Sequence, residues 1–234
     1  MSKLIDNKAR QTLIWDIMML FLTFFIVFVV SIFPKGWHLI LYSGSYTLLF
    51  FSAAMTMGKN KKKMLAIISI AIIMEWVSSL LDLAVLESIS EGLNFCFFTF
   101  LIGYYINQIA QAKNVTSGVI FQAIIGYLLL GLIFSILVGI LVQFNPGMFS
   151  FSTTIEPGSE GSLSEYIYFG FVTMSTLGYG DIVPLMPFSR SLSILISVSG
   201  QLYLAILIAL LVGKYASHKE YGKTDKNHPN RPAE

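Results

Sequence analysis

Long apolar stretches dominate the chain, and short polar connections separate them. A helix needs about 20 mostly apolar residues to cross the hydrocarbon core of a bilayer. Six segments reach that length: Thr12 to Phe33, His38 to Met57, Met64 to Leu86, Leu93 to Gln111, Gly118 to Gln143 and Ser189 to Lys214. The pattern therefore predicts an all-α membrane protein with six transmembrane helices.

A seventh apolar segment, Leu163 to Ser175, is too short to cross a bilayer. A helix that enters lipid without crossing it is tolerated only where other protein covers its ends. We therefore expect this segment to be a re-entrant helix. The connection before it, residues 144–162, is rich in proline and glycine and predicts an exposed loop.

Composition agrees with a membrane location. Hydrophobic residues make up 55% of the chain and charged residues 12%, whereas an ordinary soluble domain is about 25% charged. The single cysteine, Cys96, excludes an intrachain disulfide. No histidine or cysteine cluster has the spacing of a metal site, so neither zinc nor a redox cofactor is expected.

The positive residues predict the orientation in the membrane. If the N-terminus is cytoplasmic, all of the 15 lysines and arginines except Lys35 and Arg190 fall on the inner side. Such a bias is typical of cytoplasmic loops. We therefore expect a multi-pass protein of the cell membrane, with both termini in the cytoplasm.

The run Thr176–Asp181, with the sequence Thr-Leu-Gly-Tyr-Gly-Asp, carries the main chemical signal. A backbone that aims consecutive carbonyls at one axis needs residues that tolerate positive φ, and Gly178 and Gly180 supply them. Leu177 and Tyr179 can then point away from the axis and brace the strand against surrounding helices. The alternative interpretation is that the two glycines only mark a tight turn.

This run resembles the selectivity filter of the potassium-channel superfamily, and the resemblance extends from Leu163 to Lys214. The residues Tyr168–Ser175 look like the pore helix of that family. The resemblance implies passive, potassium-selective conduction rather than an enzyme. Potassium ions would be the permeant ligand, without a cofactor. By this resemblance, dehydrated ions are held along a filter made of Thr176, Leu177, Gly178, Tyr179 and Gly180.

The residues that would support the filter depart from the family pattern. Asp181 would lie at the outer mouth. Many relatives carry two tryptophans where this chain has Tyr168 and Phe169, and those indoles donate hydrogen bonds to the filter. Tyr168 can still donate to Asp181, but Phe169 has no donor. Thr173 is a substitute donor in this interpretation, and we expect the brace behind Tyr179 to be weaker.

One filter segment cannot encircle an ion, and the chain contains a single good copy. Closed symmetry solves this problem, so we expect a homotetramer. Gly200, near the middle of the last span, is a candidate gating hinge or, alternatively, a packing position under the pore helix. Gly131, Ser135 and Gly139 form a small-residue ridge suited to close helix contact.

Three regions follow from this pattern. Residues 1–113 are expected to form a four-helix, sensor-like domain without gating charges. Residues 114–214 would form the pore, with an outer helix, pore helix, filter and inner helix. Residues 215–234 would be a short cytoplasmic tail, expected to be disordered. The fourth span contains no lysine or arginine, so strong voltage gating is not expected.

Glu75 and Asp82 lie within the third span, seven residues apart and hence on one helix face. They are candidate proton- or ligand-sensing acids, or structural hydrogen-bonding groups. Lysines on the inner side either bind anionic lipid or only fix the topology, and no nucleic-acid partner is expected. A poorly conducting, pore-derived receptor or regulatory subunit remains the alternative function. The sequence does not indicate the gating stimulus.

Overall fold

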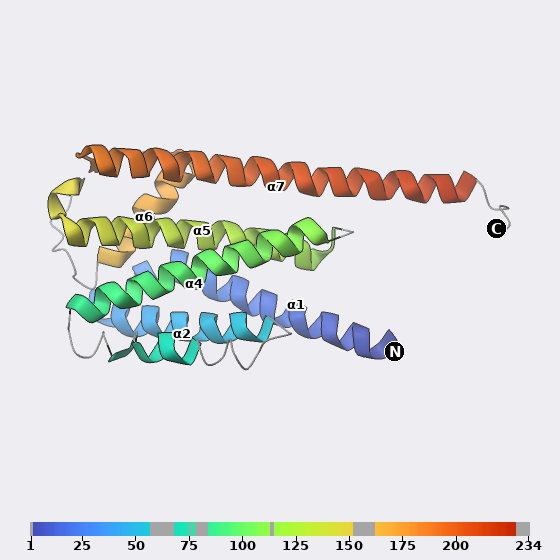
Figure 1. The fold of residues 1–234 in the computed structure, drawn as a ribbon, viewed down its shortest axis with the longest axis horizontal. Helices are drawn as coiled ribbons and strands as arrows, with labels where there is room; N and C mark the ends of the chain where they lie inside the picture. Colours follow the sequence, from blue (N-terminus) through green and yellow to red (C-terminus); the bar gives the residue numbers. More distant parts are fainter. Residues whose placement is uncertain are drawn as a thin grey trace.

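The computed structural model describes residues 2–56, 68–74, 76–77, 84–112, 115–151 and 162–227. These residues are mostly helical (Figure 1). The helices are α1 (Ser2–Phe24), α2 (His38–Thr56), α4 (Ala84–Gln111), α5 (Ser117–Phe144), α6 (Ser162–Met174) and α7 (Pro187–Asn227). Residues 68–74 and 76–77 are also helical.

Shorter elements complete the described chain. A π-helical turn, Phe25–Val29, and a 3-10 turn, Val30–Ile32, extend α1, and a 3-10 turn at Lys35–Trp37 leads into α2. Another 3-10 turn, Pro146–Met148, follows α5. Two short strands, β1 (Phe149–Phe151) and β2 (Ile182–Pro184), pair in antiparallel fashion. Within the described residues, this small sheet is the one departure from the all-α prediction.

The helix α5 lies between two groups of elements (Figure 1). On one side it contacts α1 and α4, and α2 packs on α1. On the other side it contacts α6 and α7. The start of α1 and the end of α7 lie at one end of the bundle, whereas α6 crosses α5 at the opposite end and reaches α7 (Figure 1). In the described part of the chain, α5 thus joins α1, α2 and α4 to α6 and α7.

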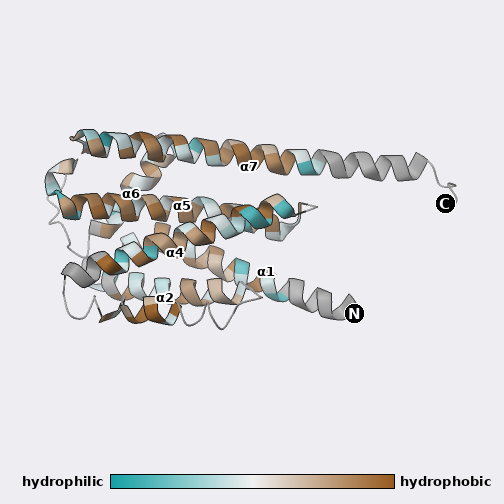
Figure 2. Ribbon diagram, in the orientation of Figure 1, coloured by the Kyte–Doolittle hydropathy of each residue, from teal (hydrophilic) through white to brown (hydrophobic). Residues whose placement is uncertain are grey.

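Within the described residues, four helical segments are long and apolar enough to cross a membrane: Gln11–Ile32, Ile89–Gln111, Ser117–Phe144 and Pro187–Tyr215. Figure 2 shows the apolar character of α5 and of the first half of α7. The second expected span coincides with α2, and most of the third, 64–86, lies outside the described residues. A membrane protein is therefore supported, while the count of six spans stays a prediction.

An aromatic core joins α1, α2 and α4. Phe50 of α2 meets Phe97 of α4 edge to face, with ring centroids 4.5 Å apart, and it also lies against Phe98 at 5.9 Å. Met19 of α1 is fully buried in the same cluster. Aromatic pairs in this geometry contribute about 0.5–1.5 kcal/mol beyond the area they bury. The same buried cluster also includes residues of α5 and Ile167 of α6, so these helices share one core.

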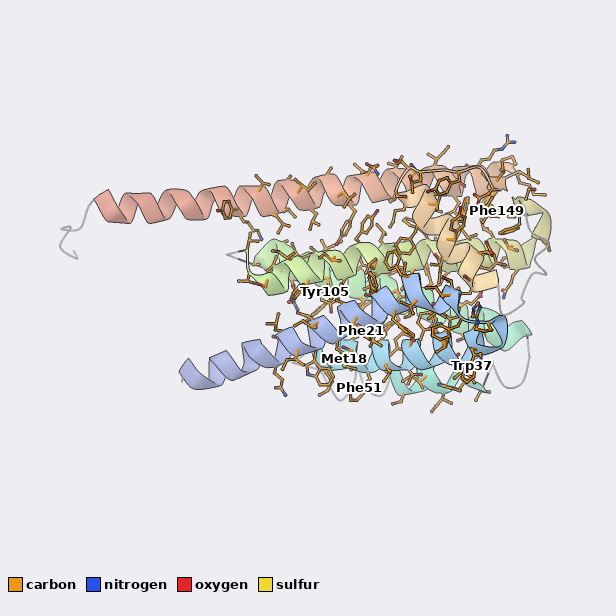
Figure 3. All side chains as sticks on the ribbon, turned by 180° about the vertical axis from the view of Figure 1, so that it is seen from behind. Met18, Phe21, Trp37, Phe51, Tyr105 and Phe149 are labelled. Atoms are coloured by element: carbon orange, nitrogen blue, oxygen red, sulfur yellow. The ribbon has the colours of Figure 1, made fainter. Side chains whose placement is uncertain are left out.

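A buried polar cluster connects this core to α5. The Asp16 carboxylate of α1 is 2% exposed and accepts hydrogen bonds from Gln122 Nε2 at 2.9 Å and from Tyr105 Oη at 3.4 Å. Gln122 also donates to Gln108 Oε1 at 3.2 Å. Figure 3 labels Tyr105 in the interior of the bundle. A buried polar group costs free energy unless it is hydrogen-bonded, and these neutral donors supply the bonds.

The last helix differs from the expectation at its C-terminal end. The sequence interpretation ended the span at Lys214 and expected residues 215–234 to be disordered, but α7 continues through Gly213 to Asn227. A helix that is already nucleated extends at low cost. The sequence has no proline between Pro187 and Pro229 that would end the helix earlier. Residues 215–227 are therefore a helical extension of α7.

Candidate functional site

The small-residue ridge on α5 positions α6. The ridge consists of Gly131, Ser135 and Gly139. The Phe171 ring of α6 lies so close over Gly131 that a side chain there would overlap it. At Gly170, an added Cβ would lie 2.8 Å from Ser135 Oγ and 3.4 Å from the Gly131 carbonyl. The expected close helix contact is confirmed, and α6 is its partner.

The helix α6 ends in a Schellman motif, which starts the candidate filter. Leu177 N–H donates to the Val172 carbonyl at 3.0 Å, and Thr176 N–H donates to the Thr173 carbonyl at 3.0 Å. This pair of bonds requires a left-handed residue directly after the helix, a position usually taken by glycine. Here Thr176 takes it, with φ of 64°.

Positive φ recurs at every second residue of the run. Gly178 has φ of 55° and Gly180 has φ of 82°. Among the described residues Thr176 is the only non-glycine with positive φ, and a β-branched residue in that region is a strained outlier. Such strain persists where the surrounding structure fixes it, and it clusters at functional sites. Alternating signs of φ allow successive carbonyls to face the same side, as an ion filter needs.

Two side chains of the run are largely exposed. Leu177 is 60% exposed and Tyr179 is 69% exposed. We expected both to brace the strand against surrounding helices, but the described helices leave most of each side chain uncovered.

Tyr168 and Asp181 join the pore-helix candidate to the residue after the run. Tyr168 Oη donates to Asp181 Oδ2 at 2.6 Å, and Asp181 Oδ1 accepts from Ile182 N–H at 3.1 Å. The hydrogen bond to Asp181 raises the pKa of Tyr168 to about 12. Thr173, expected to act as a side-chain donor, contributes its backbone carbonyl to the helix end.

Gly200 lies directly beneath the end of α6. A Cβ there would be 2.5 Å from the Met174 carbonyl oxygen, and the next residue, Gln201, places Nε2 3.5 Å from the same oxygen. The helix α7 is continuous through Gly200. The geometry supports the packing interpretation of this glycine, while its role as a hinge stays a prediction.

The other candidate residues give less information. Glu75 and Asp82, the possible sensing acids, lie outside the described residues. The helix α4, which contains the fourth expected span, has no lysine or arginine. In the part of the chain that the structure describes, no three histidine, cysteine, aspartate or glutamate side chains are grouped so that they could hold a metal ion.

Two features of the site were missed by the sequence interpretation. Lys214 of α7 lies against the C-terminal end of α4, and β1 pairs with β2 directly after Asp181. The alternation of Phe149, Ser150 and Phe151 is a weak strand signal that could have indicated β1. The position of Lys214 depends on long-range packing, and no local signal predicts it.

The comparisons with known proteins all find ion channels. Residues 137–216 match a family described as "Ion channel". The chain is 38% identical over 76 residues to potassium voltage-gated channel protein shk-1 of Caenorhabditis elegans. It is 31% identical over 106 residues to potassium voltage-gated channel subfamily A member 10 of Mus musculus, and 33% identical over 61 residues to the inward rectifier potassium channel Kirbac3.1 of Paramagnetospirillum magnetotacticum.

These similarities cover only part of each protein. The matches span 32%, 44% and 26% of this chain, and 14%, 20% and 21% of the respective relatives. No solved structure gives a significant match. The matched region of the family contains α6, the Thr176–Asp181 run and most of the apolar part of α7. Residues 137–216 of this chain are thus similar to an ion-channel family, and parts of the chain are similar to potassium channels.

Proposed function

We propose that this protein is a potassium-selective ion channel that conducts passively through a carbonyl filter formed by Thr176–Gly180. The observation that carries the proposal is the positive φ at Thr176, Gly178 and Gly180, on a strand held at the end of α6. Consecutive carbonyls on one side of such a strand can replace the water around a dehydrated potassium ion. Two observations support this choice: the match to an ion-channel family over residues 137–216, and the similarity of parts of the chain to potassium channels.

A homotetramer completes the filter. One strand offers carbonyls to only one side of an ion, so a closed ring of identical subunits is needed. The exposure of α7 supports this assembly: only 11% of its most apolar stretch is buried in the subunit, against 67% for α5. Neighbouring subunits would cover α7 and the exposed side chains of Leu177 and Tyr179.

The end of α6 contributes electrostatically. A helix carries a partial negative charge at its C-terminal end, and α6 ends at Met174, immediately before the filter. Four such ends around one axis would favour a cation at the inner side of the filter and disfavour an anion. The same positions on neighbouring subunits would therefore act together.

The helices that precede the filter-bearing region bear on how the channel opens. Because α4 has no lysine or arginine, the helical domain of residues 1–113 does not respond steeply to voltage. Glu75 and Asp82 of the third expected span stay candidates either for proton or ligand sensing or for structural hydrogen bonding. The distribution of positive residues supports cytoplasmic termini in the cell membrane, with anionic lipid near the inner surface.

Reconstitution of the purified protein tests the proposal. Vesicles loaded with potassium should lose it rapidly down an outward potassium gradient. Vesicles loaded with sodium should lose it far more slowly down a sodium gradient of the same size. The mass of the solubilised complex should equal four chains. Gly178→Ala, which forces a side chain into a left-handed position, should abolish flux while Gly213→Ala preserves it. A tetramer that passes no potassium would favour the receptor alternative.

A further inference from the structure

The segment that follows the filter is fixed by a strand from before α6. In the two-stranded sheet, Phe151 pairs with Ile182 and Phe149 pairs with Pro184. The residue Ile182 comes directly after Asp181. Beyond the strands, Leu185 N–H donates to the Met148 carbonyl at 2.9 Å. The chain leaving the filter is thus tied to the chain leaving α5.

Ser189 is a second anchor for the same segment. Its side chain is fully buried, and Oγ lies 2.7 Å from the Met148 carbonyl and 3.0 Å from the Met186 carbonyl. The same oxygen accepts from Met186 N–H at 3.2 Å. One hydroxyl therefore joins the start of α7, the segment after β2 and the turn before β1.

Phe149 is the third anchor and connects the sheet to α6. Its ring meets Phe169 edge to face, with centroids 5.2 Å apart and an interplanar angle of 71°. Both rings are buried. Figure 3 labels Phe149 at the end of the molecule where α6 lies. Phe169 is the residue that follows Tyr168, so the same turn of α6 touches Asp181 through one residue and β1 through the next.

We infer that the strand β1, which includes Phe149, and the side chain of Ser189 in α7 together form a clamp. This clamp positions the filter and keeps it in its conducting shape. We call these contacts the outer clamp. The inference rests on the proposed function. Aligned carbonyls repel one another, and a bound cation offsets that repulsion. When the ions leave, the strand keeps its shape only if both ends are fixed. The Schellman motif fixes the start, and the outer clamp fixes the end.

The outer clamp also accounts for Phe169. This side chain cannot donate a hydrogen bond to the filter, but its ring packs against Phe149 and so ties α6 to β1. A stiff contact to the strand that pairs with β2 supplies mechanical support in place of a direct hydrogen bond. Phe149 and Ser189 act through β2 rather than by touching the ion, and are therefore positioning residues.

The test uses the full-length channel in a planar bilayer. External potassium is removed for increasing intervals and then restored, and the recovered fraction of the current is measured. Ser189→Ala and Phe149→Leu should lose current roughly 2- to 10-fold faster than the unaltered protein, the range expected for one lost hydrogen bond or packing contact. Raising external potassium during the interval should suppress that loss, because bound ions hold the strand.

Two matched controls separate positioning from general damage. Ser150→Ala changes an exposed side chain of β1, and Ser193→Ala changes a serine one turn further along α7 that bonds to the Ser189 carbonyl within its own helix. Both should behave like the unaltered protein. If Phe149→Leu fails to assemble, Ser189→Ala, which removes a single oxygen, decides the question.

Three outcomes overturn the inference. The first is equal recovery of the clamp variants and the unaltered protein. The second is a loss of current that does not depend on external potassium, which would indicate a defect of folding or assembly. The third is an unaltered protein that conducts no potassium at all, which defeats the proposed function and the clamp together. In the first two outcomes the proposed function stands and only the clamp fails.

Discussion

Lys214 of α7 caps the C-terminal end of α4, with its Nζ 2.7 Å from the carbonyl oxygen of Ala112. The same ammonium lies 2.9 Å from the Ala110 carbonyl and also contacts that of Ile109. The last carbonyls of a helix lack partners within the helix, and a lysine there also complements the negative end of the dipole. The part of α7 around Lys214 is thereby tied to the C-terminal end of α4.

Replacing Lys214 should therefore change gating. Only residues 112–116 separate α4 from α5, and Lys214 adds a direct contact between α4 and α7. We expect a movement of α4 to reach α7 through this contact. Lys214→Met removes a cap worth about 1–2 kcal/mol in a partly buried geometry. The open–closed equilibrium constant should change by about 5- to 30-fold. Single-channel open probability measures this change, and potassium selectivity should remain as before.

Lys214→Arg is the matched variant, because it keeps a cation and several donors at the same position. Its open probability should lie much nearer to that of the unaltered protein. If Lys214→Met and Lys214→Arg gate alike, the cap does not transmit movement between α4 and α7.

Gly200→Ala should weaken the contact between α6 and α7. The new Cβ would lie 2.5 Å from the Met174 carbonyl oxygen, an atom that cannot move away without shifting the end of α6. Overpacking of this kind costs about 1–3 kcal/mol. The melting temperature of the assembled channel should fall, together with the conductance.

Gly213→Ala is the control on the same helix, because nothing lies within 4 Å of a Cβ added there. It should be neutral or stabilising by up to about 1 kcal/mol, since alanine favours helix. A hinge at Gly200 predicts the opposite pattern for Gly200→Ala, namely unchanged or higher thermal stability with altered opening. A rise in melting temperature would thus reject the packing interpretation.

Tyr168→Phe should reduce potassium selectivity by releasing Asp181. The variant removes the 2.6 Å hydrogen bond and leaves the ring in place. Asp181→Asn weakens the same bond from the other side. If the two residues act as a pair, the double variant should be no worse than the more severe single variant. Permeability ratios from bilayer recordings measure the effect, and additive losses would show that the residues act separately.

The pKa of Tyr168 also predicts a pH dependence. Because it is raised to about 12, the stabilisation from this hydrogen bond is fully present below the ordinary tyrosine pKa of about 10. It is lost only as the pH rises through the raised value. Selectivity should therefore be constant between about pH 6 and 9 on the outer side. A decline of selectivity within that range would assign the titration to another group.

Local patterns predicted much of the fold. The apolar lengths indicated α1, α4, α5 and α7, and the short apolar stretch before Thr176 indicated α6. The glycines at positions 178 and 180 indicated the left-handed backbone. The positive φ of Thr176 was harder to predict from the sequence. Threonine disfavours positive φ, and only the end of α6 imposes it here.

Long-range contacts were beyond the reach of the sequence. The pairing of β1 with β2 joins segments on either side of α6, and the Lys214 cap joins positions 102 to 105 residues apart. Such contacts depend on how α5 places its neighbours, and no local propensity encodes them. The length of α7 was missed for another reason. The residues after Lys214 are polar and were interpreted as a disordered tail, but a helix that already exists extends into such residues at low cost.

Potassium selectivity is tested most directly by the reversal potential of single channels with potassium on one side of the bilayer and sodium on the other. Carbonyl oxygens of Thr176–Gly180 that replace the hydration shell of potassium predict a large reversal potential, of the sign set by potassium flux alone. A reversal potential near zero, with sodium carried as readily as potassium, would contradict the assignment of this strand as a potassium filter.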